Sequence, residues 1–405
     1  GPTSPRVGFR FVLAGVVWGL AMLVRLHGVL LLPPIALWLG WHCGAFRHLP
    51  WRKAVTGGLV PLRLRWASAW FLAGVTTLVL GWPWLWLDPA RNLSRYLLSG
   101  AGRHAVHVYY LGQVWADRDV PWHYPLLMFA WTVPLGLLAL GICGWAAWLR
   151  HPIGRCDALP DGIRGDFGLI ALAGSFLLVV FAWPGVPVYD GVRLFLPVFP
   201  LWAVFAGLGA KWLSRCWREA DGPGVGGRDR RGLGRPLPHA ARVGVIGLVV
   251  LLQGSGLILY HPCQTSYYNL LAGGLRGAEC LGLEVTYWGD AVRESLLAEA
   301  ARRAPGQPVL YGPNLAPFQA PAVAMSSPSL ATSETAIVGW DDARPETASE
   351  CRYALVYRRR ADLGPVEWVL SHGELVLEVQ VQGVWVARLM RLRDPMPPRR
   401  AEPSE

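Results

Sequence analysis

The sequence predicts an α-helical multi-pass membrane protein with about seven membrane segments, followed by a small extracytoplasmic α/β domain. Of its 405 residues, 53% are hydrophobic and only 16% are charged, whereas a soluble globular chain averages about 25% charged residues. Long apolar runs recur before Tyr260, and many of the 22 tryptophans lie at the ends of these runs. Tryptophan is enriched where a helix meets the lipid headgroups. These observations together indicate an integral membrane protein.

The apolar segments are uneven in length, and several are shorter than the roughly 20 residues that a straight helix needs to cross a bilayer. The first two flank Arg25 and His27. A single helix over 14–41 would bury Arg25 in hydrocarbon, which is costly, so a short hairpin with Arg25 near its turn is preferred. The predicted segments are residues 11–24, 28–42, 67–86, 123–149, 167–183, 194–212 and 243–260.

The distribution of arginine and lysine predicts which side of the membrane each loop faces. Loops 43–66 and 213–242 are strongly basic and are assigned to the cytoplasm, and alternation then places loop 87–122 outside. The predicted domains are a polytopic membrane domain over 1–260, an extracytoplasmic α/β domain over 261–393, and a disordered tail over 394–405.

Within the predicted α/β domain, apolar residues recur at helical spacing over 291–303. The stretch 313–350 is rich in proline, serine, alanine and threonine, and it is predicted to be a long surface loop or partly disordered. Alternating apolar residues predict strands at 308–311, 353–357, 374–381 and 384–392.

Four polar clusters fall on the same predicted side of the membrane. The first is Arg25 with His27, and the third is the segment 188–197, which contains Asp190 and Arg193. A guanidinium at a membrane boundary offers a donor fork that suits a phosphate, although an arginine that only extends to the headgroups is an equal alternative. For Asp190, a local ion pair or a helix N-cap is the alternative to a chemical role.

The second cluster is the segment 104–125, which is too polar for hydrocarbon and too aromatic for a plain solvated loop. Sugars are bound by flat ring faces and hydrogen-bonding tips of this kind, and an interfacial aromatic belt is the alternative. The histidines lack metal-ligand spacing, so no metal site is predicted from them. A divalent cation as cofactor is left open, and no other cofactor is expected. The candidate sugar-binding residues are His104, His107, Tyr109, Tyr110, Gln113, His123 and Tyr124.

The fourth cluster, residues 261–290, begins where the last apolar segment ends. Its glycines do not form a phosphate-binding P-loop, because no GK[ST] follows them, and a packed junction between domains is the alternative to a site. Asn92-Leu93-Ser94 is a weak glycosylation signal. The net charge of +11 is concentrated in the loops, so no nucleic acid partner is expected. The cluster's candidate residues are Glu284, Tyr287, Trp288 and Asp290.

Several blocks resemble a known family. Gly15–Pro34, GVVWGLAMLVRLHGVLLLPP, is similar to a segment of membrane glycosyltransferases of the dolichyl-phosphate-mannose-protein mannosyltransferase type, with Arg25 where lysine is usual. Residues 109–128, 189–200 and 260–291 resemble later blocks of bacterial members. The resemblance covers most of 11–291 and fades after about residue 310.

The resemblance implies a multi-span enzyme of the glycosyltransferase C superfamily, located in the cell membrane of a bacterium. Such enzymes transfer a sugar from a polyprenyl-phosphate carrier to a hydroxyl of a protein, lipid or glycan acceptor outside the cytoplasm. The usual catalytic aspartate loop has no counterpart here, so the chain is interpreted as the C-terminal portion of such an enzyme. Asp190, Glu284 and Asp290 are candidates to assist proton transfer, and Arg193 and Arg25 to bind the phosphate.

Two other functions stay open from the sequence. A transporter or flippase for a lipid-linked substrate would often show inverted repeats, and the sequence has no evident repeat. A non-catalytic membrane anchor for the C-terminal domain would not need four polar clusters on one side of the membrane. Membrane lipid is an expected partner in each case.

Overall fold

The computed structural model describes residues 5–42, 59–99, 105–150, 161–220, 239–340 and 349–393. The chain divides into two compact units. Unit 1 comprises residues 1–105 and 150–180, and unit 2 comprises residues 106–149 and 181–405. The candidate residues from His107 onward all belong to unit 2.

Unit 1 is helical and is organised by the packing of its first helix against α4. The first glycine of the GVVWG sequence, Gly15, sits so close to α4 that a Cβ there would collide with the carbonyl oxygen of Trp70. The indoles of Trp18 and Trp70 stack with centroids 4.5 Å apart. Small residues thus let the two backbones approach closely and leave the tryptophans to fill the crossing. The helices are α1 (Pro5–Val24), α2 (Leu32–His42), α4 (Leu59–Gly81), α5 (Pro83–Leu87), α6 (Pro89–Ser99) and α9 (Asp161–Phe181, up to Val180 in unit 1).

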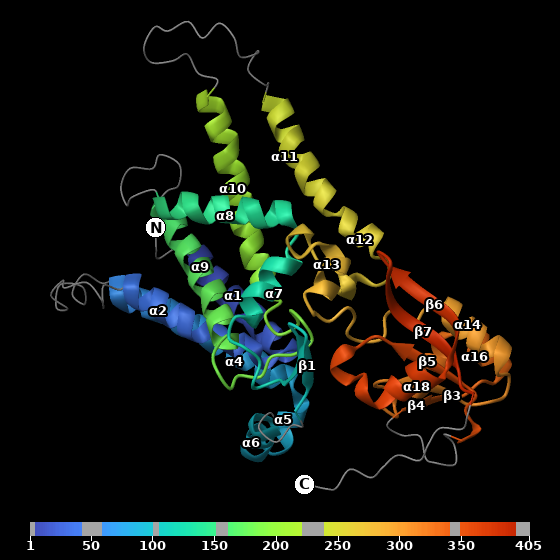
Figure 1. Ribbon diagram of the computed structural model, residues 1–405. Helices are drawn as coiled ribbons and strands as arrows, with labels where there is room; N and C mark the ends of the chain where they lie inside the picture. The colour runs from blue at the N-terminus through green and yellow to red at the C-terminus, as the bar shows by residue number, and fades with distance from the viewer. Residues whose placement is uncertain are drawn as a thin grey trace, which may run out of the picture. The chain divides into compact units, whose positions relative to one another are not determined.

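The helical part of unit 2 is built around a sharp bend. Helices α7 (Tyr124–Thr132) and α8 (Leu135–Arg150) meet at 115° across Val133-Pro134, because a proline cannot continue the helical hydrogen bonds. Helix α8 then packs on α10 (Val198–Ala220) at a glycine crossing, where a Cβ on Gly144 would collide with the Phe205 carbonyl oxygen. Helices α11 (His239–Gln253) and α12 (Ser255–Leu259) lead toward the sheet (Figure 1).

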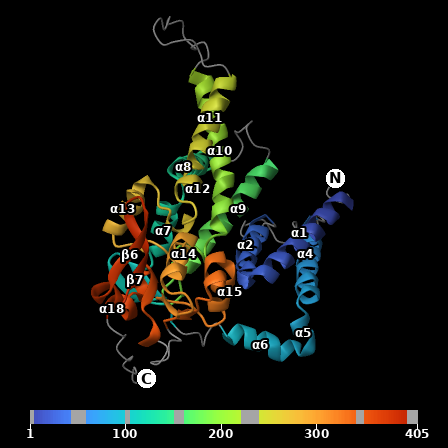
Figure 2. The same ribbon diagram turned by 90° about the vertical axis from the view of Figure 1, so that its right-hand side faces the viewer.

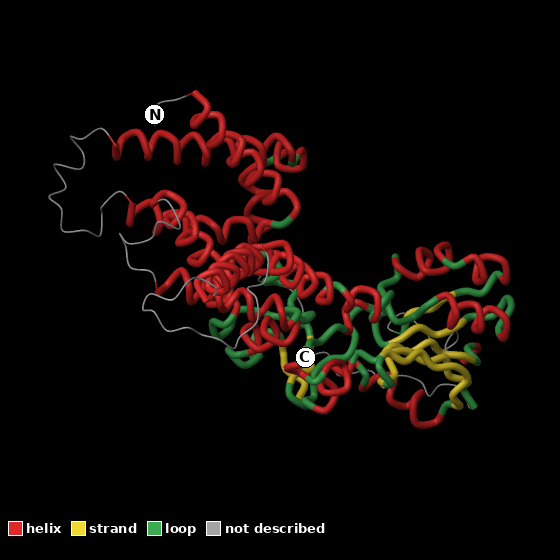
Figure 3. The backbone as a smooth tube through the Cα atoms, turned by 90° about the horizontal axis from the view of Figure 1, so that it is seen from above, coloured by secondary structure: helices red, strands yellow, loops and turns green. Residues whose placement is uncertain are grey.

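A five-stranded mixed sheet forms the rest of unit 2, in the order β4-β3-β5-β7-β6. Strand β3 pairs in parallel with β4 and β5, whereas β7 pairs antiparallel with β5 and β6. Helices α14 and α18 lie on opposite sides of the sheet (Figure 2), and Figure 3 shows the strands side by side. The elements are α13 (Gly274–Cys280), α14 (Glu294–Arg303), β3 (Val309–Gly312), α15 (Gln319–Ser326), α16 (Pro328–Ser333), β4 (Ile337–Gly339), β5 (Tyr353–Tyr357), α18 (Glu367–His372), β6 (Glu374–Val381) and β7 (Val384–Arg391).

Strand alternation separates the two faces of this sheet. Ala354, Val356 and Met390 share one face and pack with Val366 and Val369, which lie beside and within α18. Burial of these apolar side chains between helix and sheet is the main source of stability for this layer.

The sequence predictions for this region are largely confirmed. Strands β3, β5, β6 and β7 begin and end within one residue of the predicted limits, and α14 begins three residues after the predicted helix start. The stretch 313–350 was expected to lack structure, and that expectation is wrong: α15, α16 and β4 form there. Residues 341–348 and the predicted tail 394–405 lie outside the described residues.

The predicted fold class, an α-helical multi-pass membrane protein with about seven membrane segments, is wrong. The structure is a mixed α/β fold with a five-stranded sheet. Among the described helices, none is by itself long and apolar enough to cross a bilayer, and only the bent pair α7–α8 reaches that length and composition together. The apolar segments do form helices, but breaks at Arg25, Trp82, Pro134 and Gly254 divide them.

The predicted loops also differ from the structure. Helix α4 begins at Leu59, inside the predicted loop 43–66, and α10 and α11 extend into the predicted loop 213–242. The predicted loop 87–122 contains helix α6 and two strands, β1 (His107–Tyr110) and β2 (Gln113–Ala116). Hydropathy counts the apolar residues of a segment and overlooks the prolines and turns that end its helix.

Candidate functional site

A β-hairpin carries the second polar cluster. Strands β1 (His107–Tyr110) and β2 (Gln113–Ala116) pair antiparallel through the two-residue turn Leu111-Gly112. Both turn residues have positive φ, 51° and 80°, as the tight turns favoured in hairpins require. The Gly112 N–H donates to the carbonyl oxygen of Gly282 at 2.9 Å, so the hairpin tip is attached to the fourth polar cluster.

Two tyrosines of this cluster are core residues. Tyr110 and Tyr124 are fully buried, and the Tyr110 hydroxyl lies 2.8 Å from Nδ1 of His123. Burial raises the pKa of Tyr110 to about 12, because desolvation disfavours the phenolate. The Tyr124 hydroxyl donates to the Gly191 carbonyl oxygen at 3.5 Å. These residues attach the hairpin and α7 to the third cluster and do not face a ligand, whereas Gln113 is exposed on β2.

Asp190 is the centre of a buried ion-pair network. Its Oδ2 accepts hydrogen bonds from Arg193 Nη1 and from the indole N–H of Trp288, each at 3.0 Å. Its Oδ1 lies 3.1 Å from Arg359 Nη1, and the carboxylate side chain is only 6% exposed. The residue has a φ of 55°, which aspartate adopts more readily than most residues but which still needs support from its surroundings.

The exposed part of the site is the pair Arg193 and Trp288. The Arg193 guanidinium lies 5.3 Å from the Trp288 ring centroid and 5.9 Å from that of Tyr189. Its side chain is 46% exposed, and Trp288 is 51% exposed. This arrangement is a cation–π contact at the surface, in which the half-exposed Arg193 side chain is held by its ion pair with Asp190.

Glu284 is the buried carboxylate of the site. Its two oxygens accept hydrogen bonds from the backbone N–H groups of Arg360, at 2.7 Å, and Ala361, at 3.0 Å. Burial raises the pKa of Glu284 to about 7, although these two bonds and the charge of Arg359 act in the opposite direction. A carboxyl group with that pKa changes protonation close to neutral pH.

A small cavity joins the three clusters that lie in unit 2. Its volume is about 10 Å³, which is the space of a single water molecule. It connects the hairpin, the Asp190 loop, the Glu284 segment and the turn after β5, and it is called the carboxylate cavity below. Its lining residues are His107, Val108, Tyr109, Asp190, Glu284, Tyr287, Arg359 and Ala361.

Sequence reasoning overlooked the arginines at 358–360 and Asp362. Arg359 Nε lies 2.6 Å from Asp362 Oδ2, and His107 Nδ1 lies 3.6 Å from the other oxygen of Asp362. Arg360 Nη1 donates to the Tyr109 hydroxyl at 3.0 Å. Three consecutive arginines directly after an apolar strand were the available signal, because arginines that follow a buried strand need acidic partners.

Asp290 has a different environment from the other two carboxylates. It accepts hydrogen bonds from the hydroxyls of Thr265, at 2.5 Å, and Thr286, at 2.9 Å, and it does not line the carboxylate cavity. These contacts join the two ends of the fourth cluster, which is a structural role. The nearby Cys263, like Cys280 and Cys351, is a free thiol, so the disulfide left open by the sequence is absent among these three.

The remaining candidates lie elsewhere in the chain. Arg25 and His27 belong to unit 1, where α1 ends and the 3₁₀ turn Leu26–Leu31 begins; burial, and then the charge of Arg25, lower the pKa of His27. His104 lies outside the described residues. Asn92 is buried in α6, and its side-chain amide donates to the Trp84 carbonyl oxygen at 2.7 Å, which does not suit a glycosylation site.

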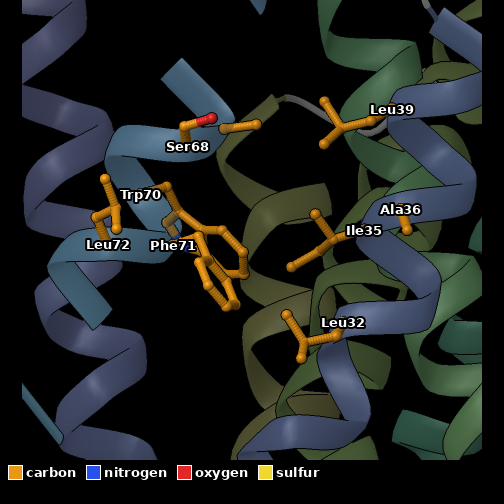
Figure 4. A pocket seen from close by; sticks show the side chains of 9 residues that line it. Leu32, Ile35, Ala36, Leu39, Ser68, Trp70, Phe71 and Leu72 are labelled. Atoms are coloured by element: carbon orange, nitrogen blue, oxygen red, sulfur yellow. The ribbon is translucent and has the colours of Figure 1, made fainter. Parts of the chain in front are cut away.

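Unit 1 has one larger pocket of its own, with a volume of about 440 Å³ between α2 and α4 (Figure 4). Its lining is almost entirely apolar and includes Trp70 and Phe71. None of the candidate residues lines it. Among the described residues, no group of three or more histidine, cysteine or acidic side chains is arranged to hold a metal ion.

Comparison with known proteins provides no relative for this chain. No protein-family model, no curated protein sequence and no solved structure matches it.

Proposed function

We propose that the chain takes part in transferring a sugar from a polyprenyl-phosphate carrier to an acceptor hydroxyl on the extracytoplasmic side of a bacterial cell membrane. The observation that carries this proposal is the convergence in unit 2. Asp190, Arg193, Glu284 and Trp288, which lie in blocks that resemble a glycosyltransferase family, are joined by direct contacts and one shared cavity. Separate segments that served only as connectors would not need to bring these groups together.

We infer a different role for each group. Arg193 would bind the phosphate of the carrier, because its guanidinium is at the surface and is oriented by Asp190. Trp288 would support that arginine, because its ring lies beside the guanidinium and its N–H is bonded to Asp190.

Glu284 is the best candidate for accepting a proton from the acceptor hydroxyl, because its pKa of about 7 suits a general base. The carboxylate cavity admits only about one water molecule. A proton would therefore reach Glu284 through a bridging water. Asp190 Oδ2 already accepts hydrogen bonds from Arg193 and Trp288, and its Oδ1 is buried beside Arg359, so its role is to hold Arg193 and Trp288.

A lipid-linked donor requires access from a membrane, and the surface of unit 2 favours such contact. Leu257, Ile258 and Leu259 in α12 are 68%, 80% and 71% exposed, and contiguous exposed apolar side chains typically mark a contact with lipid or protein. We place the sugar-transfer site on the extracytoplasmic face of that membrane.

The test is a sugar-transfer assay on membranes from cells that express the full chain. Radiolabelled polyprenyl-phosphate mannose and glucose serve as donors, and transfer to protein, lipid and glycan fractions is counted. Arg193→Ala is expected to lower transfer about 100- to 1000-fold, by analogy with the loss of one donor to a developing anion. The control is Arg302→Ala, which removes an exposed arginine from a similar i,i+3 ion pair, with Glu299.

Two results would overturn the proposal. One is wild-type membranes that transfer no more sugar than membranes without the chain. The other is an Arg193→Ala variant that transfers sugar as fast as Arg302→Ala does.

One observation favours the non-catalytic alternative, a binding platform attached to a membrane. Asp190 Oδ2 and both oxygens of Glu284 already accept hydrogen bonds from donors within the chain. A platform would bind the polyprenyl-phosphate sugar without turnover. Equilibrium binding of the labelled donor, with no transfer in any fraction, would identify it.

A further inference from the structure

We propose that Arg359 is the positioning residue of this site, acting through Asp190 and through the turn that holds Glu284. This inference rests on the proposed function, because it assigns Arg359 a part in the same reaction. Arg359 lies in the sheet region, beyond the blocks that resemble a glycosyltransferase, and no sequence pattern assigned it a role.

The Arg359 guanidinium connects three separate segments. Its Nη1 lies 3.1 Å from Asp190 Oδ1 and donates to the Tyr287 carbonyl oxygen at 2.9 Å. Its Nε lies 2.6 Å from Asp362 Oδ2, and the residue is buried. The planar guanidinium carries its donors on separate nitrogens, so that Nη1 reaches Asp190 and Tyr287 while Nε reaches Asp362, whereas a lysine side chain has only one nitrogen.

Arg359 also begins the turn that binds Glu284. The 3₁₀ turn Arg360–Asp362 follows it directly, and the backbone N–H groups of Arg360 and Ala361 both donate to the Glu284 carboxylate. A shift of Arg359 would therefore move the two donors of Glu284 and one partner of Asp190 at the same time. The buried Glu284 and the surface pair Arg193–Trp288 are coupled through this one side chain.

The conformation of Asp190 is consistent with a need for such support. Its φ of 55° is uncommon for a residue other than glycine, although aspartate adopts it more readily than most, and the loop around it forms neither helix nor strand. Such conformations persist where surrounding contacts hold them. Because Arg193 is half exposed and Arg359 is buried, solvent and salt weaken the attraction of Asp190 to Arg193 more than its attraction to Arg359.

The charges around Glu284 provide a readout that a purely structural role would not change. The groups that face it are Arg359 from the turn, Asp190 from its loop, His107 and Tyr109 from β1, Tyr124 from α7, Tyr357 from β5, and Tyr268 and Tyr287 from its own segment. The positive charge of Arg359 lowers the pKa of Glu284. Removing that charge should raise the pKa of Glu284 further. The rate of sugar transfer, which increases as Glu284 ionises, should then begin to increase at a higher pH than in wild type.

The experiment measures sugar transfer in the membrane assay from pH 5 to 9 for wild type, Arg359→Met and Arg359→Lys, with Arg302→Met as the matched control. Arg359→Met is expected to lower kcat/KM about 10- to 100-fold, as the loss of a supporting partner of a functional group does at metal sites. The increasing part of its pH–rate profile, called the rising limb, should move to higher pH. Arg359→Lys keeps the charge, so its rising limb should lie at the wild-type pH while its rate stays low.

The outcomes separate this inference from the function on which it rests. No transfer by wild type refutes the proposed function. Transfer by wild type with an unchanged rate and pH profile in Arg359→Met refutes the role of Arg359 alone. If Arg359→Met and Arg359→Lys lose the same fraction of the transfer rate and both keep the wild-type rising limb, the effect is structural, and this result also refutes the role of Arg359. If Arg359→Met fails to accumulate, Arg359→Gln, which also removes the charge, replaces it in these comparisons, and the same outcomes support or overturn the inference.

Discussion

Replacing Glu284 by glutamine tests whether a buried, titrating carboxyl group lies at the centre of unit 2. Burial raises the pKa of Glu284 from its ordinary value of 4.5 to about 7. The folded chain therefore holds this proton more tightly than the unfolded chain does. By linkage, the free energy of unfolding is highest below pH 4.5, falls as the pH rises toward 7, and is level above that.

The size of the effect follows from the pKa difference. One pKa unit corresponds to 1.36 kcal/mol, so the rise from 4.5 to about 7 should lower stability by about 3 kcal/mol across this window. Glutamine has no proton to lose in this range. The Glu284→Gln variant should therefore lose this dependence on pH, and it should be less stable than wild type near pH 5, because one oxygen that accepts a backbone N–H is replaced.

The assay is amide hydrogen exchange at pH 5, 6, 7 and 8, corrected for the intrinsic exchange rate and followed in peptides that cover residues 353–362. The control is Glu299→Gln. Glu299 is paired with Arg302 and Arg303, and their hydrogen bonds lower its pKa to about 2, so it stays ionised throughout the range measured. Two results would refute the reasoning. One is a free energy of opening, measured by exchange, that does not change with pH in wild type, and the other is the same change with pH in wild type and Glu284→Gln.

Two further predictions concern the stability of unit 2. Asn269→Ala should lower the free energy of unfolding by about 3 kcal/mol, because the buried Asn269 amide donates to the Ala130 and Val133 carbonyl oxygens at the α7–α8 bend, at 2.7 and 2.6 Å; a loss below 1 kcal/mol in denaturant-dependent proteolysis would contradict this. Gly144→Ala should cost about 1–3 kcal/mol, because the added Cβ would collide with the backbone of α10. The matched Gly207→Ala, with open space around its Cβ, should stabilise by up to about 1 kcal/mol, and equal melting temperatures for the two alanine variants would exclude the predicted close approach.

The sheet region was the most predictable part of the chain. Alternation of apolar residues located β5, β6 and β7 to within one residue, because side chains of a strand alternate between faces and burial selects apolar residues on a covered face. The apolar segments, which were predicted to cross a membrane, were less predictable. Pro134 divides the single predicted segment 123–149 into two helices that meet at 115°. A hydropathy count does not detect a single helix-breaking residue of that kind.

The candidate site was predictable only in part. Asp190 and Arg193 are three residues apart, so their ion pair could be proposed as one alternative from the sequence alone. Trp288 was a candidate for its aromatic ring, and its bond to Asp190 was not foreseeable. Tyr110 and Tyr124 were candidates for sugar binding and are instead buried, because a polar tip on an aromatic ring is also what a core tyrosine uses to bond its neighbours.

By itself, the sequence determined the local elements of this protein: the apolar helices, the strands after Pro308, and the polar segments between them. Each of these depends on residues close together in the chain, in which apolar side chains recur with the period of the helix or strand because one face is buried. Only the tertiary structure decided that Arg359 would pair with Asp190 and that its turn would bind Glu284. Charged partners this far apart in the chain meet only after the sheet has folded, because the desolvation of a buried guanidinium can be offset only by acids that other elements bring to it.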